Sequence, residues 1–527
     1  MAKLKVDQAM KRAKAHMRKG EMAEARALYE AILADYPKNE RVKTALAELS
    51  GPVKPALGAK GNASGAAGEP PAEVFAKLSQ AYQAGRLQDV HAMTGQLLGQ
   101  YGKSAKLWNF RAAVSSNLNL LDDAEQALRQ VVNLQPDMVA TKSNLGVILE
   151  RLGKLSEAEQ CYRAVIAASP EFPEAHNNLG NILKGAGKLE EAQSCYMNAI
   201  ARKADYVDAH YNLANTLRER ELLEDAKQQY FKTLKLQPKL AEAWYGLGQT
   251  MAELKSGPEA IEAYQRALAV KPGYVLAMVE QLREQSQLCD WRACDLFDQY
   301  GAELGVTGEA ALPFPLLPFE DHPAHQLARS RNWAKSHLSA AAPISTIPPT
   351  PADGRKIRLG YFSADFHDHA TMFLMAGILR HHDRSKFEIF VFSYGKSKTD
   401  AQRDQVLENV DQFFDVRDMS DGDLTKLARE QNLDIAIDLK GYTRDGRLEP
   451  FAKRLAPVQI SYLGYPGTLG ADFIDYIVAD PVVIPPEQRS GYHEKIIYLP
   501  DCYQPNDNTR EISSKPITRA ELDLPED

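Results

Sequence analysis

The sequence predicts an α-helical solenoid followed by an α/β domain built on a parallel sheet. The first observation is a period of 34 residues that runs through the first half of the chain. The second is a change near Lys356, after which short β-type apolar runs alternate with helical stretches. The third is the length of 527 residues, which is too long for a single hydrophobic core.

The 34-residue period is carried by residues of the same kind at the same place in each repeat. Prolines mark one grid, whose remaining point is Ala204: Pro136, Pro170, Pro238 and Pro272. Small residues stand twelve positions earlier, and tyrosines share the register: Ala124, Ala158, Ala192, Ala226 and Ala260; Tyr162, Tyr196, Tyr230 and Tyr264. Each unit reads as two helices and a turn, and it resembles the tetratricopeptide repeat. Because one such hairpin cannot bury its apolar stripe alone, the repeats should stack into a solenoid whose concave face binds polypeptides.

Composition divides the chain further. We expect a first helical hairpin at 1–50, a Gly/Ala/Pro-rich flexible linker at 51–72 and the repeat solenoid at 73–274. A helical, proline-rich connector is expected at 275–355, and the α/β domain at 356–527. The final residues read as a domain boundary, so we expect either a fragment or a split arrangement.

Charge and cysteine usage narrow the classes of function. The net charge of −7 is interspersed along the chain, which argues against nucleic acid as the main partner. No run of about 18 apolar residues predicts a membrane span, and the basic first twenty residues lack the apolar core of a secretory signal. The five cysteines have no metal-binding spacing. We therefore expect no metal site and a reducing compartment, the cytoplasm.

The second half predicts strands and helices in alternation. Strands are expected at 356–362, 387–393, 413–416, 434–439, 458–463 and 476–479, and helices at 371–381 and 423–431. This order implies a parallel sheet covered on both faces, a Rossmann-like half. In such sheets the ligand lies beyond the carboxyl ends of the strands.

Three polar turns follow predicted strands, at 363–369, 440–444 and 464–468. His369 stands at a helix N-terminus, where the helix dipole keeps an imidazole neutral and able to accept a proton or hold a sugar oxygen. The alternative is that His369 only caps its own helix. Asp365 is equally typical of an ordinary turn carboxylate. Gly464, Pro466 and Gly467 predict a tight turn whose backbone can approach a ligand.

Several long segments resemble the first catalytic half of the protein O-GlcNAc transferase and SPINDLY family: Ile357–Phe366 with His369 and Phe373–Met375, Arg454–Gln459, Leu463–Gly470 and Asp475–Ile477. That family joins a tetratricopeptide superhelix to a glycosyltransferase of the GT-B type. The resemblance implies transfer of a sugar, most simply from UDP-GlcNAc, to serine or threonine hydroxyls of proteins held in the repeat groove. It also implies an inverting displacement without a metal, and a homo-oligomer through the repeats is a further prediction.

The resemblance assigns roles residue by residue. His369 matches the active-site histidine, whereas His367 is read as a turn or rim residue. The sugar cleft would be lined by Asp365, Asp438, Lys440, Tyr442, Gly464, Tyr465, Pro466, Gly467 and Thr468. For Asp438, Lys440 and Tyr442 a solvated-loop role stays open. Asn144, Asn178 and Asn212 match a ladder of amides that binds an acceptor backbone, and helix packing is their alternative role.

One departure keeps three hypotheses open. The second Rossmann-like domain, which holds the nucleotide-sugar in the family, does not follow in this sequence. The chain is therefore predicted to be an O-GlcNAc transferase-like enzyme, a catalytically incomplete repeat module that binds proteins, or a SPINDLY-type O-fucosyltransferase. The residues that choose the donor would lie in the absent half.

Overall fold

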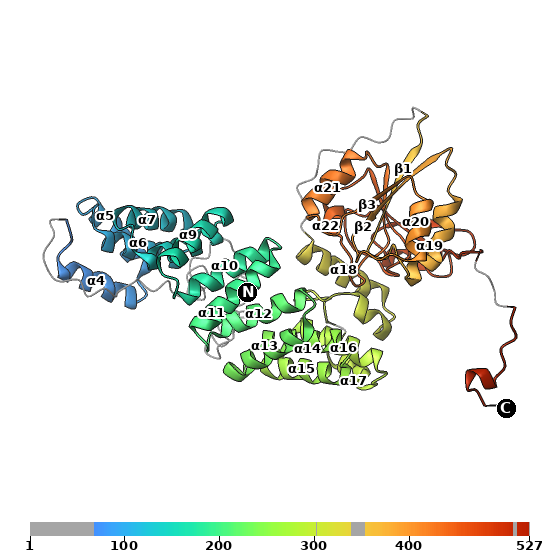
Figure 1. The fold of residues 1–527 in the computed structure, drawn as a ribbon, viewed down its shortest axis with the longest axis horizontal. Coiled ribbons are helices and arrows are strands. Elements are labelled where there is room, and N and C mark those ends of the chain that lie inside the picture. Colours follow the sequence, from blue (N-terminus) through green and yellow to red (C-terminus); the bar gives the residue numbers. More distant parts are fainter. Residues whose placement is uncertain (1–67, 302, 339–353, 510–513, 526–527) are drawn as a thin grey trace, which may run out of the picture. The chain divides into compact units, whose positions relative to one another are not determined.

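The computed structural model describes residues 68–301, 303–338, 354–509 and 514–525 (Figure 1). The predicted hairpin at 1–50, most of the linker and the prolines at 343–351 lie outside these ranges. Residues group into two compact units, Met1–Lys239 and Leu240–Asp527. The division falls inside the region whose residue pattern predicts the solenoid.

The first unit consists of helical hairpins in series. Its helices are α4 (Ala72–Gln83), α5 (Leu87–Leu98), α6 (Ala105–Asn117), α7 (Leu121–Leu134), α8 (Val139–Arg151), α9 (Leu155–Ala168), α10 (Pro173–Gly185), α11 (Leu189–Arg202), α12 (Val207–Glu219) and α13 (Leu223–Leu236). The predicted small residues and tyrosines are buried between paired helices. A Cβ on Gly180 would lie 2.6 Å from the Tyr196 ring, so close helix packing explains the small residue opposite each tyrosine.

The turn between paired helices is also periodic. A residue with positive φ recurs every 34 positions: Asn119, Gly153, Gly187, Glu221, Lys255 and Cys289. The amide after each turn bonds back to the helix, as in Lys188 N–H to the Leu183 carbonyl at 2.9 Å, which is the Schellman geometry. The turn at Cys289 joins α16 (Val275–Gln287) to α17 (Arg292–Tyr300), so the repeat geometry continues one period beyond the residue pattern.

The second unit begins with helices and ends in a sheet. It contains α14 (Ala241–Glu253), α15 (Gly257–Val270), α16 and α17, a 3₁₀ segment η1 (Phe314–Phe319) and α18 (Pro323–His337). Seven strands follow: β1 (Ile357–Ser363), β2 (Phe387–Ser393), β3 (Gln412–Asp415), β4 (Ile435–Asp438), β5 (Val458–Ser461), β6 (Tyr476–Ala479) and β7 (Lys495–Tyr498). All neighbouring pairs are parallel, in the order β3-β2-β1-β4-β5-β6-β7.

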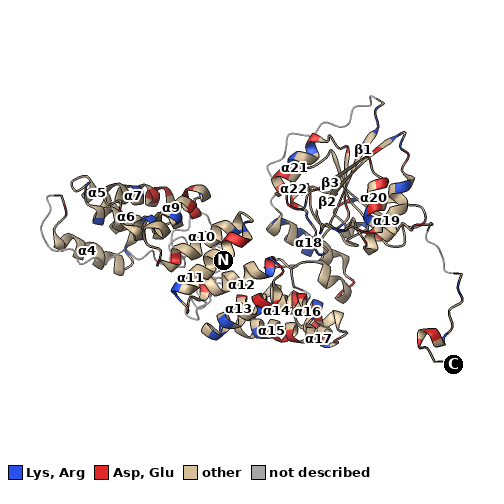
Figure 2. Ribbon diagram, in the orientation of Figure 1, with Lys and Arg blue, Asp and Glu red and all other residues tan. Residues whose placement is uncertain are grey.

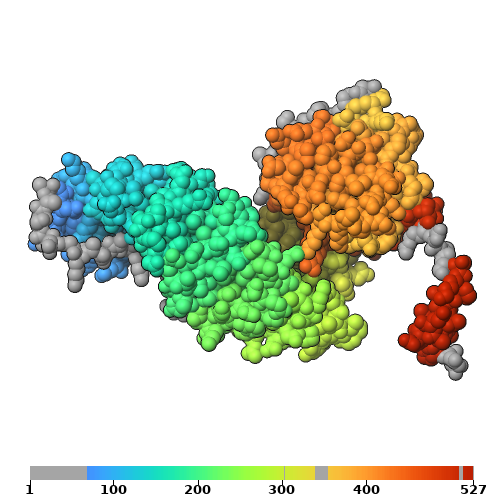
Figure 3. All heavy atoms as spheres, viewed as in Figure 1, coloured from blue at the N-terminus to red at the C-terminus, as the bar shows by residue number. Residues whose placement is uncertain are grey.

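Helices cover both faces of this sheet. Leu359 and Ile389 pack on one face with Met375 of α19 (Ala370–His381) and with α20 (Ala401–Glu408). Phe362 and Phe392 pack on the other, with α21 (Asp421–Glu430) and α22 (Glu449–Ala452). Figure 1 shows these two pairs of helices on opposite sides of the strands, and in Figure 3 the atoms of this domain form a compact surface. The parallel, doubly covered sheet confirms the predicted fold class.

Two α-helices and one strand of the α/β domain were not predicted. The helix α20 is short and polar and depends on Asp400, whose carboxylate accepts the Arg403 N–H at 2.9 Å. The helix α22 is a single turn, and β7 is an edge strand of four residues. These elements contain too few residues to show the hydrophobic period by which a helix or strand is predicted from sequence.

No helix among the described residues has the length and apolar character needed to cross a membrane. Lysine, arginine and acidic residues are spread along the helices of both units (Figure 2).

Candidate active site

The order of strands in the sheet reverses between β1 and β4. The chain moves from β1 outward through β2 and β3 and then returns to the other side of β1 as β4. The loops after β1 and β4 therefore part in opposite directions, and open parallel sheets bind ligands at such a point. Two of the three predicted turns, 363–369 and 440–444, meet here.

A buried ion pair joins these two turns. The Lys440 ammonium lies 2.9 Å from Oδ2 of Asp365, and the two side chains are 9% and 8% exposed. The Asp365 amide in turn donates to Ser363 Oγ at 3.0 Å. Because the pair links residues 75 positions apart in sequence, it fixes the turns after β1 and β4 to each other.

His369 is the N-cap of α19. Its backbone is extended, and Nδ1 accepts the Thr371 N–H at 3.2 Å. Its side chain remains 41% exposed, and Asp365 Oδ2 lies 3.5 Å from Nδ1. The capping role and an accessible imidazole therefore coexist in one residue.

Asp438 is the last residue of β4, and its side chain bonds to the loop that follows. Its carboxylate is fully buried and accepts the N–H groups of Lys440 at 3.2 Å and Gly441 at 2.7 Å. Burial raises the pKa of Asp438 to about 6, against the opposing effect of these hydrogen bonds and of Lys440. Asp438 thus shapes the turn that carries Lys440.

Tyr442, Tyr465 and Thr468 form the packed base of the neighbouring loops. The Tyr442 hydroxyl donates to the Leu469 carbonyl at 2.7 Å, and its ring lies 5.4 Å from that of Tyr465. The Thr468 hydroxyl donates to Glu494 at 2.6 Å. All three predicted residues are buried, so they position the loop backbone, and Glu494 is a partner that the sequence analysis missed.

The turn after β5 contains the remaining predicted residues. A Cβ on Gly464 would lie 1.9 Å from the Leu439 carbonyl oxygen, so only glycine allows this turn to approach the end of β4. A Cβ on Gly467 would lie 2.8 Å from the Tyr465 hydroxyl oxygen. Pro466 between them is exposed.

A cavity of 730 Å³ lies within the second unit, beside these loops. One wall is apolar and comes from the connector, including Phe314 and Pro315. A charged wall comes from α14 and α16, where Arg283 pairs with both Glu280 and Glu284. Burial raises the pKa of Glu280. Tyr442, Arg444 and Pro466 form the third wall. The sequence carried no signal for this cavity because its walls come from segments far apart in the chain.

The predicted asparagines lie in the first unit, on α8, α10 and α12, and each is half-buried. Asn212 donates both amide hydrogens, at 3.1 Å each, to the side-chain oxygens of Asn177 and Asn181. The side-chain oxygen of Asn212 takes part in neither bond and is therefore the group that can accept a peptide N–H.

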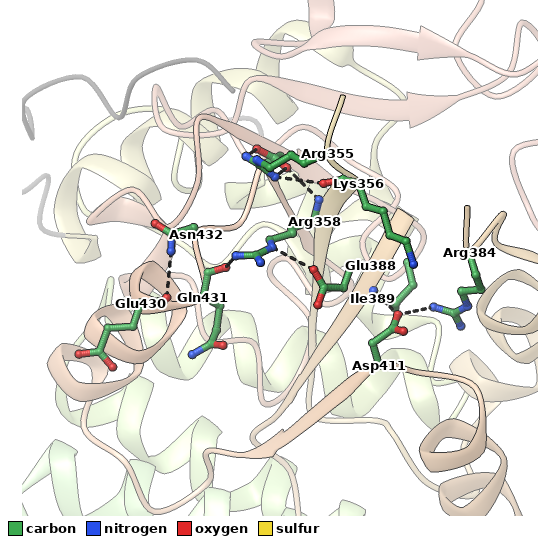
Figure 4. A network of polar contacts seen from close by, with 11 residues as sticks. Arg355, Lys356, Arg358, Arg384, Glu388, Ile389, Asp411, Glu430, Gln431 and Asn432 are labelled. Atoms are coloured by element: carbon green, nitrogen blue, oxygen red, sulfur yellow. Dashed lines mark hydrogen bonds and ion pairs between the residues drawn. The ribbon is translucent and has the colours of Figure 1, made fainter. Parts of the chain in front are cut away.

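The amino-terminal edge of the sheet is also charged, but its charges bond to one another (Figure 4). Arg358 reaches Glu388 at 2.9 Å and the Gln431 carbonyl at 3.0 Å. Asp411 accepts from Arg384 at 2.8 Å and from the Ile389 amide at 2.7 Å. These contacts tie the strand ends together and assign this edge a structural role.

Over the ranges that the structure covers, no cluster of three or more His, Cys, Asp or Glu residues is arranged to hold a metal ion.

Comparison with known protein families supports both halves. Residues 337–517 match glycosyl transferase family 41. Tetratricopeptide repeat profiles match residues 6–49, 151–187, 177–241 and 224–275. Residues 337–517 are thus similar to a family 41 glycosyltransferase domain, and stretches before them are similar to tetratricopeptide repeats.

Several curated proteins are similar to parts of this chain. A probable UDP-N-acetylglucosamine–peptide N-acetylglucosaminyltransferase of Arabidopsis thaliana, SEC, is 35% identical over 231 residues, which are 41% of this chain and 23% of the relative. The Caenorhabditis elegans enzyme of that name is 33% identical over 32% of this chain and 15% of the relative. A probable UDP-N-acetylglucosamine–peptide N-acetylglucosaminyltransferase of A. thaliana, SPINDLY, is 34% identical over 28% of this chain and 17% of the relative. The chain thus matches less than a quarter of the length of these relatives.

Among solved structures, an O-GlcNAc transferase mutant of Thermobaculum terrenum is 22% identical, with a TM-score of 0.41, over 63% of this chain and 58% of that one.

Proposed function

Because this chain is similar to a family 41 glycosyltransferase domain behind stretches similar to tetratricopeptide repeats, we propose that it is a protein O-glycosyltransferase. It transfers a sugar from a nucleotide-sugar to serine or threonine hydroxyls of proteins held by the repeats, with inversion at the anomeric carbon. The observation that carries this proposal is the match of residues 337–517 to the family. A repeat module that only binds proteins is not favoured, because that match lies in a catalytic domain.

The geometry at the carboxyl ends of β1 and β4 supports the assignment. The His369 side chain is 41% exposed there, whereas the side chains of Asp365 and Lys440 are buried beside it. In the proposed reaction the His369 imidazole contacts the reacting sugar or the acceptor hydroxyl. The buried tyrosines and Thr468 hold the loop backbone around it.

The 730 Å³ cavity suggests a path for the acceptor. Its apolar wall suits the side chains of an extended segment, and its charged wall and Arg444 can contact the backbone and polar groups of that segment. The row of Asn144, Asn178 and Asn212 would hold another part of the acceptor through its backbone, with little dependence on sequence.

We propose UDP-GlcNAc as the donor and expect no metal cofactor. Both types of plant relative, SEC and SPINDLY, carry names that specify UDP-N-acetylglucosamine. GDP-fucose is the competing donor.

The test uses the protein expressed from its whole gene, incubated with acceptor proteins and either UDP-GlcNAc or GDP-fucose, with and without EDTA. We expect an N-acetylhexosamine on serine or threonine in the mass spectrum, unaffected by EDTA. His369→Ala should lower kcat/KM by roughly 100-fold or more, the range for a lost general acid–base or polar contact. The matched control is His381→Ala on the last turn of α19. Fucose transfer alone would overturn the choice of donor, and undiminished turnover in His369→Ala would remove this residue from the mechanism.

A further inference from the structure

The contacts of His369 determine which of its nitrogens carries the proton. The Thr371 backbone N–H can only donate, and it points at Nδ1 from 3.2 Å. Nδ1 must therefore be unprotonated to accept it, and the proton of a neutral ring resides on Nε2. With Nδ1 engaged by the helix N-terminus, Nε2 is the nitrogen left for a substrate.

Asp365 opposes this arrangement when considered alone. Its Oδ2 lies 3.5 Å from Nδ1, and a carboxylate at that distance favours a proton on Nδ1 and a charged ring. The burial of the Asp365 side chain would strengthen this effect, because water screens buried charges weakly.

Lys440 cancels the carboxylate at the same atom. Its ammonium lies 2.9 Å from Oδ2 of Asp365. The Thr371 hydroxyl lies 3.3 Å from that oxygen and 3.1 Å from Nδ1, so it can donate its one proton to either of them. The oxygen that faces His369 is thus held by a positively charged donor. The positive charge of Lys440 therefore offsets the effect of the Asp365 charge on the imidazole.

Two further titratable groups lie near His369. His367 also disfavours a charged ring at His369, and Asp400 is hydrogen-bonded to other residues. The His367 ring lies 5.8 Å away, and burial, with the positive charge of Lys398, lowers the pKa of His367. Asp400, on the loop after β2, accepts the N–H groups of Asp368 at 3.0 Å and Arg403 at 2.9 Å. The positive end of the α19 dipole further disfavours an imidazolium at the N-cap.

We propose that the Asp365–Lys440 ion pair is a positioning device that keeps His369 neutral with its proton on Nε2, so that the imidazole donates a hydrogen bond to a substrate oxygen and does not act as a base. Lys440 and Asp365 are then positioning residues, and the sugar or acceptor contacts His369. The role of the donated bond rests on the proposed glycosyltransferase function, whereas the state of the ring does not.

The state of the ring can be measured without any substrate. Long-range ¹H–¹⁵N spectra of protein labelled with ¹⁵N-histidine distinguish the two neutral tautomers and the charged ring, and His369→Gln identifies the signal among the twelve histidines. In the unsubstituted protein at pH 7 we expect the neutral ring with the proton on Nε2. In Lys440→Met we expect the ratio of charged to neutral ring to rise by roughly tenfold, the lower end of the effect of an uncompensated charge within about 4–6 Å.

Three further variants complete the test. Lys440→Arg keeps the positive charge and should keep the neutral ring. Lys426→Met, at an exposed position of α21, should leave the His369 signal unchanged. The double variant Asp365→Asn/Lys440→Met buries no unpaired charge, so it should fold even if Lys440→Met does not, and it should return the ring to the neutral state.

A proton on Nδ1 in the unsubstituted protein would overturn the proposal. So would an unchanged His369 signal in folded Lys440→Met, or a charged ring in the double variant. A neutral ring with the proton on Nε2, combined with an absence of sugar transfer, would refute the proposed function and leave this inference standing.

Discussion

At the scale of single residues, Asp438 makes the stability of the folded second unit depend on pH. Its pKa in the folded protein is about 6, above the usual value of 3.8 for an aspartate in an unfolded chain. The folded state therefore binds this proton more tightly than the unfolded state. This contribution to stability is fully present below pH 3.8 and is lost as the pH rises through 6.

We predict that the second unit gains about 1 kcal/mol of unfolding free energy from Asp438 between pH 7 and pH 5. Asp438→Asn, which keeps an oxygen to accept the Gly441 N–H, should abolish that gain. Urea unfolding of both proteins at the two pH values measures the difference, in which the histidines common to both cancel. An equal pH dependence in the two proteins would show that Asp438 does not titrate in this window.

The glycines of the site illustrate how residue identity follows from contact distance. Gly464 is required by the Leu439 carbonyl that lies where a Cβ would stand. The sequence indicates a turn here, but the close approach of two loops, one after β4 and one after β5, is visible only in the folded chain.

At the scale of elements, the row of asparagines runs along the first helix of successive hairpins. Asn212 on α12 donates to Asn177 and Asn181 on α10, and Asn177 donates to the side-chain oxygen of Asn178 at 3.3 Å. Because an amide oxygen has two lone pairs, the side-chain oxygens of the row are suited to bind backbone N–H groups of an extended chain.

We predict that replacing Asn144, Asn178 and Asn212 together with alanine lowers kcat/KM for protein acceptors by roughly tenfold or more, since each lost hydrogen bond costs about 0.5–1.5 kcal/mol. Short peptides, which reach the candidate site without spanning the row, should lose less. Asn198→Ala, exposed on α11, is the control. Equal losses for proteins and short peptides would argue against a row that guides the acceptor.

At the scale of the whole molecule, the two compact units should respond separately to substitution. Arg329 of α18 is fully buried in the second unit. It donates to the carbonyls of Leu304 at 2.8 Å and Gly301 at 2.7 Å, and to Glu320 at 2.6 Å. This one side chain links α18 to the segment after α17 and to the connector.

We predict that Arg329→Ala destabilises the second unit by about 3–5 kcal/mol, because it leaves Glu320 and two carbonyls without their donor. Hydrogen exchange measured by mass spectrometry should show lost protection in peptides from 240–527 and unchanged protection in those from 68–239. Arg329→Lys, which keeps the charge but not the fork of donors, should fall between the two proteins. Equal losses in both ranges would indicate one cooperative unit.

Much of the fold could be predicted from local patterns. The 34-residue period and the strand–helix alternation follow from the spacing of apolar and small residues, which any segment displays by itself. β2 and β6 were predicted with their observed bounds. Short elements such as α22 and β7 escaped because they contain too few residues to show a period.

The candidate site divides in the same way. Sequence alone determined that polar turns follow the strands and that His369 begins a helix, because turn and cap residues act on their own neighbours. Only the tertiary structure decided that Lys440 neutralises Asp365, that Asp438 is buried, and that connector and helices enclose a cavity beside Arg444. These properties arise from contacts between residues far apart in the chain, and such contacts are set by the order of strands in the sheet, which no local pattern encodes.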